Sequence, residues 1–381
     1  MENVSHTLAG LALARCGLGR TTPLATTALV AGANLPDVDL LWSSFRSALV
    51  YFHYHRGWTH ALAGHAFLTI ALWAVLLAID RFLPGREGAE RARPAPLLLA
   101  AALGVGSHVV MDAANSYGVR LLLPWSDRWF YGDLWAIVDP WLWLILGGTV
   151  FMTARGGRRR TLAWSMGAAV AAIVVLSAPV VPPACRAAWA ACLAITVALC
   201  RHAARRRRPA GPSAAAAGLC LLLGYAGVGA VSHRSALARL RRLAPAAIGG
   251  AAASSGGGAE IAALPRPADP LRWEGLVIDE RSIRHRVIGV FPALDPKEGS
   301  WTVHPRNLDG PAARALWTGC AGELVLEFFR FPFAAVETDA DGGREIVVRD
   351  ARYTRRGRGF AVFAAPLGAD GLPAIDSDQC P

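Results

Sequence analysis

Lysine is almost absent from this sequence, and charged residues of every kind are scarce. Lys297 is the only lysine, and charged residues make up 18% of the chain against 54% for hydrophobic ones. Globular soluble domains carry about 25% charged residues, so this composition excludes an ordinary soluble protein. The positive charge is carried by arginines that cluster between apolar runs, which is typical of membrane topology signals. No direct contact with nucleic acid is therefore expected.

The sequence also lacks the basic start of a secretory signal, and His6 interrupts its first apolar run, so no cleavable signal is predicted. Six later runs are long enough to cross a hydrocarbon core of about 30 Å as helices of roughly 20 residues. These runs are Ala61 to Phe82, Pro96 to Ala114, Leu134 to Thr153, Leu162 to Val181, Ala184 to Cys200 and Ala214 to Val231. Two shorter runs, Ser5 to Leu18 and Pro23 to Leu35, predict a helical hairpin that enters the bilayer.

The composition changes after the last apolar run. Residues 244–270 are rich in Ala, Gly, Ser and Pro, which predicts a flexible linker. Residues 271–381 contain strand-like runs at 323–329 and 346–348 and predict a small β-rich soluble domain. The expected fold is mainly α: a polytopic membrane bundle followed by this domain. Its parts are a metal-site domain at 1–155, additional transmembrane helices at 156–243, the linker and the C-terminal domain.

Histidines and aspartates gather near the ends of the predicted membrane helices, where ionisable side chains are costly and often functional. If consecutive helices cross the bilayer in alternate directions, these residues all lie at one membrane face. They are His6, Asp37, Asp39, His55, His60, His108, Asp112 and Asp139. His108 and Asp112 are four residues apart and therefore share one face of a helix. The pattern predicts a polar site at this face.

Imidazole and carboxylate without any accompanying cysteine form a ligand set that suits zinc, manganese or iron. We expect a divalent metal ion, zinc or manganese, bound by residues from this group. The predicted ligands are His6, Asp37, His55, His60, His108 and Asp112. Simpler interpretations stay open for single members: His6 or His65 serves as an interhelical hydrogen-bond partner, and His108 bonds directly to Asp112.

Three polar motifs follow one another in the first 150 residues. They are Asn34-Leu35-Pro36-Asp37-Val38-Asp39, His55-Arg56-Gly57-Trp58-Thr59-His60, and His108-Val109-Val110-Met111-Asp112 followed by Asn115-Ser116-Tyr117-Gly118. In this order they resemble the membrane-bound metal-dependent hydrolases of bacteria, also described as LexA-binding, inner-membrane-associated hydrolases. The resemblance implies hydrolysis at a bound metal and a bacterial inner-membrane location. The order of His, Asp, His and His-x-x-x-Asp also resembles zinc-dependent phospholipase C, whose later ligands have no match here.

The leading hypothesis is metal-dependent hydrolysis of an ester or phosphoester, membrane lipids being the expected partners and a lipid or phosphoester the expected substrate. A bound divalent ion lowers the pKa of water from about 15.7 towards 7. Asp39 or Asp139 is the predicted general base, and Arg56 the predicted partner of an anionic substrate group. Two hypotheses from other classes stay open: a transporter that uses these residues as an ion relay, and a regulatory protein with a structural metal.

Arginine distribution predicts the orientation of the chain. Fifteen arginines lie in the loops opposite the predicted metal face, and five lie in the metal-face loops that precede the last span. The positive-inside rule therefore places the metal face and the C-terminal domain outside the cytoplasm. Cys320 and Cys380, the only cysteines of that domain, would then be able to form a disulfide.

Overall fold

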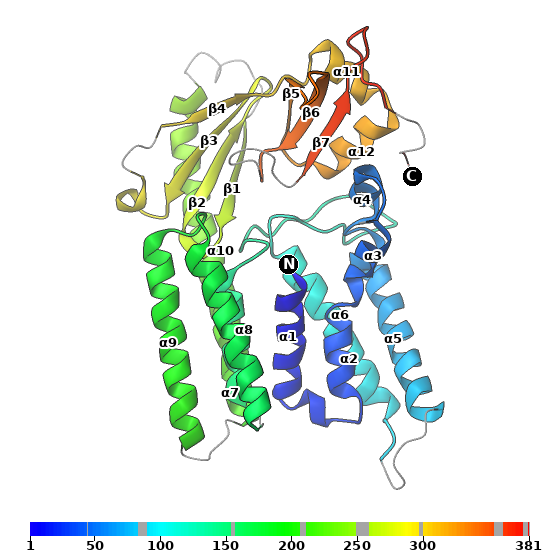
Figure 1. Cartoon of the computed structure of the whole chain (residues 1–381), viewed down its shortest axis with the longest axis vertical. Helices are drawn as coiled ribbons and strands as arrows, with labels where there is room; N and C mark the ends of the chain where they lie inside the picture. The colour runs from blue at the N-terminus through cyan, green and yellow to red at the C-terminus, as the bar shows by residue number, and fades with distance from the viewer. Residues whose placement is uncertain are drawn as a thin grey trace. The chain divides into compact units, whose positions relative to one another are not determined.

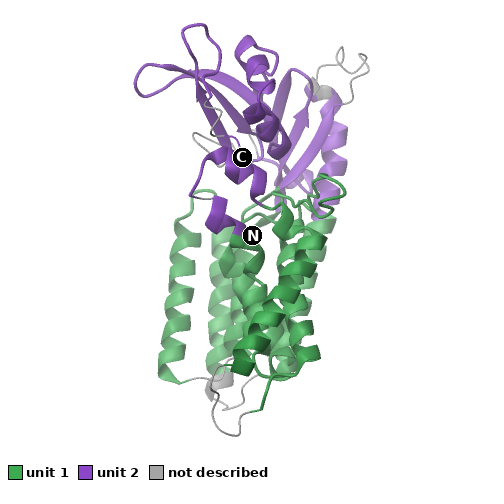
Figure 2. Cartoon of the chain, turned by 90° about the vertical axis from the view of Figure 1, so that its right-hand side faces the viewer, with its two compact units in different colours: residues 1–38, 56–231, 265–270 green, residues 39–55, 232–264, 271–381 purple. Residues whose placement is uncertain are grey.

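The computed structural model describes residues 1–43, 45–82, 90–153, 157–205, 211–248, 259–296, 300–353, 361–375 and 380. The chain divides into two compact units (Figure 2). The first comprises residues 1–38, 56–231 and 265–270, and the second comprises residues 39–55, 232–264 and 271–381. The second unit thus contains a segment from the N-terminal part of the sequence, which the predicted domain boundaries did not include.

Five helices of the described chain are long and apolar enough to cross a membrane. They are α5 (Leu62–Phe82), α6 (Pro94–Ala113), α8 (Arg158–Ser177), α9 (Pro183–Arg205) and α10 (Pro212–Ile248). Only 6% of the apolar stretch of α8 is buried inside the protein, so lipid is needed to cover the rest. The predicted membrane bundle is confirmed. Helix α10 belongs to the first unit up to Val231 and to the second unit from Ser232.

The predicted span Leu134 to Thr153 is shorter than the sequence indicated. Helix α7 runs over Pro140–Thr153, so its 14 residues cover about 21 Å, less than the hydrocarbon core of about 30 Å. Proline fits the first position of a helix but disfavours helical backbone in the residue before it, which explains the late start. Its mean hydropathy is high because the chain buries Leu142 and Leu146.

Two short helices at the N-terminus form the predicted hairpin. They are α1 (Asn3–Arg15) and α2 (Ala25–Gly32), joined through the 3-10 turn η1 (Leu18–Arg20). At 1.5 Å per residue they cover about 20 and 12 Å, so neither crosses a bilayer on its own. The pair packs beside α6 within the first unit (Figure 1).

Small residues bring these helices into backbone contact. A Cβ atom added to Gly104 of α6 would lie 2.7 Å from the carbonyl oxygen of Leu29 in α2. A Cβ atom added to Gly10 of α1 would lie equally close to the same oxygen. Glycine is therefore required at both crossings, as in other closely packed membrane helices. The chain that follows α2, η2 (Leu35–Val38), consequently runs past the C-terminal end of α6.

The second unit contains the predicted β-rich domain. One antiparallel sheet has the order β1 (Glu260–Arg266), β2 (Asp269–Ile278), β3 (Ser282–Gly289), β4 (Thr302–Pro305), and the other has β5 (Pro332–Thr338), β6 (Arg344–Asp350), β7 (Val362–Pro366). Between the sheets in sequence are the turn η5 (Pro292–Leu294) and helices α11 (Pro311–Trp317) and α12 (Cys320–Phe328). The N-terminal segment adds α3 (Asp39–Ser43) and α4 (Ala48–Tyr54). Ala236 and Leu240 of α10 pack against the first sheet.

Three details of this unit bear on the predictions. Residues 346–348 lie in β6 as expected, but the run at 323–329 belongs mainly to α12 and not to a strand. The predicted linker at 244–270 is too long at both ends, because α10 continues to Ile248 and β1 begins at Glu260; residues 249–258 lie outside the described residues. Cys320 and Cys380 form the predicted disulfide.

Candidate metal centre

Four buried side chains meet at the C-terminal end of α6. Asp37 comes from η2, His60 from the turn η3 (Trp58–His60), and His108 and Asp112 from the last turns of α6. Each side chain offers one ligand atom, and these atoms all lie within 4.8 Å of one another. The prediction that polar residues from successive helix ends converge is therefore confirmed for these four.

The distances between the polar atoms match the space that a metal ion needs. His60 Nε2 lies 3.1 Å from His108 Nε2, 3.3 Å from Asp112 Oδ2 and 3.6 Å from Asp37 Oδ1. His108 Nε2 lies 3.4 Å and 3.5 Å from the same two oxygens. Four ligand atoms placed tetrahedrally about 2.1 Å from one ion are about 3.4 Å apart. The arrangement therefore fits a tetrahedral divalent ion without rearrangement.

Both imidazole rings are held in the orientation that ligation requires. His108 Nδ1 lies 2.8 Å from the carbonyl oxygen of Ala33, and His60 Nδ1 lies 3.0 Å from the hydroxyl of Thr59. A hydrogen bond at one ring nitrogen fixes the ring and leaves the other nitrogen free for a metal. Thr59 was not predicted as a site residue. Its position directly before His60 was the only signal in the sequence.

The electrostatics of the site favour ionised carboxylates. Burial by itself raises the pKa of Asp37, but its contacts with His108 and His60 outweigh burial and hold that pKa below its usual range. Asp112 Oδ2 lies 3.1 Å from Arg56 Nη2, and Asp112 Oδ1 is also paired with the α-amino group of Met1. Two carboxylates in a buried site need such cationic partners.

Arg56 is itself held firmly beside Asp112. Its Nη1 donates hydrogen bonds to Asn115 Oδ1 at 3.2 Å and to the Gly118 carbonyl at 3.4 Å. Its guanidinium lies over the Tyr117 ring at 4.2 Å, and its backbone adopts a left-handed conformation with φ of 57°. Non-glycine residues rarely adopt this conformation outside functional sites. Asn115 was quoted in the third motif but not predicted as a site residue; its spacing of three from Asp112 was the available signal.

His6 lies beside the four residues as a fifth candidate ligand. Its ring stacks on His108 at 3.7 Å, and its Nε2 lies 3.4 Å from Asp112 Oδ1. Both ring nitrogens are buried and make no hydrogen bond of suitable geometry within the described part of the chain. Buried polar atoms normally have a partner, so His6 adds to the case for an ion or water at this position.

The structure places the remaining predicted site residues elsewhere. Asp39 and His55 belong to the second unit, where Asp39 Oδ1 lies 3.3 Å from His55 Nδ1. Asp139 precedes α7 and accepts hydrogen bonds from the Trp141 amide at 2.9 Å and from the Tyr225 hydroxyl at 2.7 Å. His65 Nε2 lies 3.2 Å from the Ala102 carbonyl oxygen on α6, in agreement with its interpretation as an interhelical hydrogen-bond partner.

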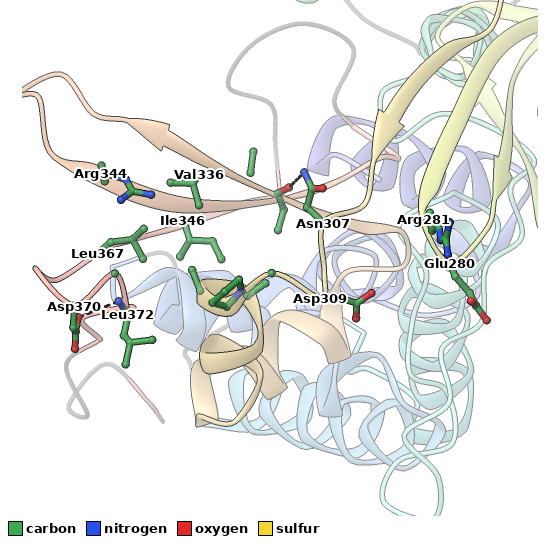
Figure 3. Close-up of a pocket in the computed structure, with 17 residues that line it drawn as sticks. Glu280, Arg281, Asn307, Asp309, Val336, Arg344, Ile346, Leu367, Asp370 and Leu372 are labelled. Atoms are coloured by element: carbon green, nitrogen blue, oxygen red, sulfur yellow. Dashed lines mark hydrogen bonds between the residues drawn. The ribbon is translucent and has the colours of Figure 1, made fainter.

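The second unit contains a pocket of about 610 Å³ with a different character. Figure 3 shows Arg344, Val336, Ile346 and Leu367 at one side and Asn307 and Asp309 at the other. Ala312 and Ala313 of α11 also line it. Its lining contains no histidine or cysteine among the residues described, so it lacks the ligand set of the metal centre.

Comparisons with known proteins agree with this assignment of the N-terminal part. Residues 1–181 match the family model described as YdjM inner membrane protein, a range that includes all four converging residues. The Bacillus subtilis (strain 168) protein described as uncharacterized protein YfhP is 28% identical over 154 residues, or 38% of this chain. The match spans 43% of that relative's length. No solved structure matches. The inner-membrane family match and the apolar helices together support a multi-pass membrane protein.

Proposed function

We propose that this protein is a metal-dependent hydrolase of the inner membrane that cleaves ester or phosphoester bonds, those of lipids included. The observation that carries the proposal is the convergence of Asp37, His60, His108 and Asp112 at spacings that fit one ion. The mixture of imidazole and carboxylate suits zinc or manganese. Such an ion supplies a Lewis acid and lowers the pKa of water to about 7.

The chain's own residues prepare this centre. The Ala33 carbonyl and the Thr59 hydroxyl direct Nε2 of each histidine towards the carboxylates. Arg56 offsets the charge of Asp112, and in the proposed reaction its guanidinium also favours an anionic substrate group. For the general base, Asp39 and Asp139 stay proposals that substitution by Asn tests. Both oxygens of Asp139 already accept hydrogen bonds, which favours a structural role for that residue.

The burial of the ligands favours a second candidate, a transport or regulatory protein that carries a structural metal. All four residues are buried, and structural metal sites are closed whereas catalytic sites keep an open position for water or substrate. Both candidates predict a bound metal. Only the first predicts turnover.

The test is purification in mild detergent, elemental analysis, and a screen of phosphoesters, phospholipids and carboxylic esters. We expect the His108→Ala variant to lose the metal and any turnover. The matched control is His65→Ala, which removes a histidine of α5 outside the centre and should retain both. Metal without turnover on any ester would favour the second candidate. Absence of metal after reconstitution with zinc or manganese would reject both.

A further inference from the structure

A compact apolar surface on and beside α3 is left uncovered by the rest of the chain. Leu41, Trp42 and Phe45 are 70%, 55% and 85% exposed, and we name these three residues the α3 patch. Leu41 and Phe45 are four residues apart, and Trp42 is next to Leu41. Large apolar side chains grouped in this way on a surface mark an interaction site.

The chain itself limits where the α3 patch can lie. Asp37 of η2 lies 3.5 Å from His108, so η2 lies at the C-terminal end of the membrane helix α6. Helix α3 begins at Asp39, the residue that follows η2. A fully extended chain covers at most about 3.6 Å per residue, so Leu41 lies within roughly 11 Å of Val38. Covalent continuity therefore keeps the patch close to one membrane surface.

The chemistry of the segment matches the interface of a bilayer. The guanidinium of Arg46 lies 4.0 Å above the Trp42 ring, which holds a positive charge at the edge of the patch. No aspartate or glutamate occurs between residues 40 and 58. Tryptophan, phenylalanine and leucine beside arginine are the residues by which interfacial segments bind anionic lipid surfaces. A soluble acidic partner would match the charge but not the three exposed apolar side chains.

We propose that the α3 patch is a lipid-binding surface specific for anionic phospholipid. Leu41, Trp42 and Phe45 enter the boundary between head groups and acyl chains, and Arg46 binds the phosphate of an anionic head group. The inference does not depend on the metal centre or on hydrolysis. Its occupant is the membrane, whereas a second copy of the chain or another protein would be a different outcome of the experiment.

The test places a photoreactive benzoylphenylalanine at Phe45 of the full chain in vesicles of phosphatidylethanolamine and phosphatidylglycerol. The matched control carries the same group at Val336, an exposed position on β5. We expect lipid adducts at position 45, detected by mass spectrometry, and none at position 336. Equal labelling at both positions, no lipid adduct at position 45, or crosslinking of position 45 to a second protein chain would overturn the proposal.

A second variant tests the role of charge. One arginine near a membrane surface changes the binding of anionic lipid by about fivefold, so Arg46→Gln should lower the phosphatidylglycerol share of the adducts by about that factor. Arg344→Gln, which removes an exposed arginine of β6, is the control and should leave the share unchanged. An unchanged share in Arg46→Gln would show that the surface does not select anionic lipid.

Discussion

Two buried carboxylates define the demands of the candidate centre at the scale of single residues. Asp37 and Asp112 both present oxygens to His60 and His108, and both are shielded from water. Like charges at such spacing repel unless cations lie between or beside them. Arg56 supplies one positive charge to Asp112. A divalent ion between the histidines and carboxylates would supply the rest, which is why we regard metal binding as the simplest explanation for their burial.

The pair of Asp139 and Tyr225 tests whether a predicted general base is structural. Removing the hydroxyl in Tyr225→Phe leaves a buried carboxylate oxygen with one partner fewer, which should lower the free energy of unfolding by about 1–3 kcal/mol. Thermal unfolding in detergent measures this, and metal content should not change. Tyr54→Phe, at an exposed tyrosine, is the control. If Asp139→Asn abolishes ester turnover without affecting unfolding, the residue acts as a base and the structural interpretation is wrong.

The contact between Arg239 and Asp295 makes the second unit sensitive to acid. Partial burial alone would raise the pKa of Asp295, but hydrogen bonds from both Arg239 Nη atoms, at 3.0 and 2.8 Å, and from the Gly289 amide lower it. The folded pKa is then below the unfolded value of about 3.9, so the stabilisation is present above that pH and is lost as pH falls through the folded pKa.

Asp295→Asn should therefore unfold more easily than the original chain at pH 7, and the difference should narrow below about pH 4. The measurement is thermal unfolding of both proteins across this range. Parallel pH dependences of the two would contradict the assigned role of Asp295.

The crossing of α2 and α6 determines at the scale of elements whether the centre forms. A Cβ on Gly104 would meet the backbone oxygens of Leu29 and Ala28 at 2.7 and 2.9 Å. Gly104→Ala should therefore separate the helices, lower the free energy of unfolding by about 1–3 kcal/mol and reduce metal content, because Asp37 follows α2 and His108 is on α6. Gly106→Ala is the control on the same helix, since its nearest neighbour is His65 at 3.6 Å. Equal metal content in the two variants would contradict this account.

Periodicity explains where element prediction succeeded and where it did not. Long apolar runs predicted α5, α6, α8, α9 and α10, because crossing a bilayer requires such runs. The run at 323–329 looked like a strand because it contains valine, leucine and phenylalanine. Its buried residues are Ala321, Gly322, Val325 and Phe328, spaced as on one face of a helix. Short apolar runs do not distinguish helix from strand until the surface that covers them is known.

The composition of the metal centre was predictable only in part at the scale of the whole molecule. Alternation of helices along the chain predicted that Asp37, His60, His108 and Asp112 share one face, and they converge. It did not separate Asp39 and His55, which pair with each other in the second unit. It also missed Thr59 and the Ala33 carbonyl, because the hydrogen bonds that orient a ligand depend on local backbone geometry and not on residue type.

The last prediction concerns the orientation of the molecule in the membrane. Fifteen arginines occupy the loops opposite the metal centre and five occupy the loops on its own side, which predicts that the centre and the C-terminal domain are extracytoplasmic. Four arginines after Val231 favour the opposite orientation, but they precede a long translocated domain, and the rule applies to short loops. The disulfide between Cys320 and Cys380 fits an oxidising compartment.

Alkaline phosphatase fused after Pro381 should therefore be active, and a fluorescent protein fused after Arg208 should fluoresce. A fusion after Pro270 is less suitable than sequence alone indicated, because Pro270 lies inside β2. Alkaline phosphatase is active only where its disulfides form, so it reports the oxidising side directly. Free thiols at Cys320 and Cys380 in protein from oxidising cells, together with an inactive phosphatase fusion, would place the C-terminal domain in the cytoplasm and reverse the assignment.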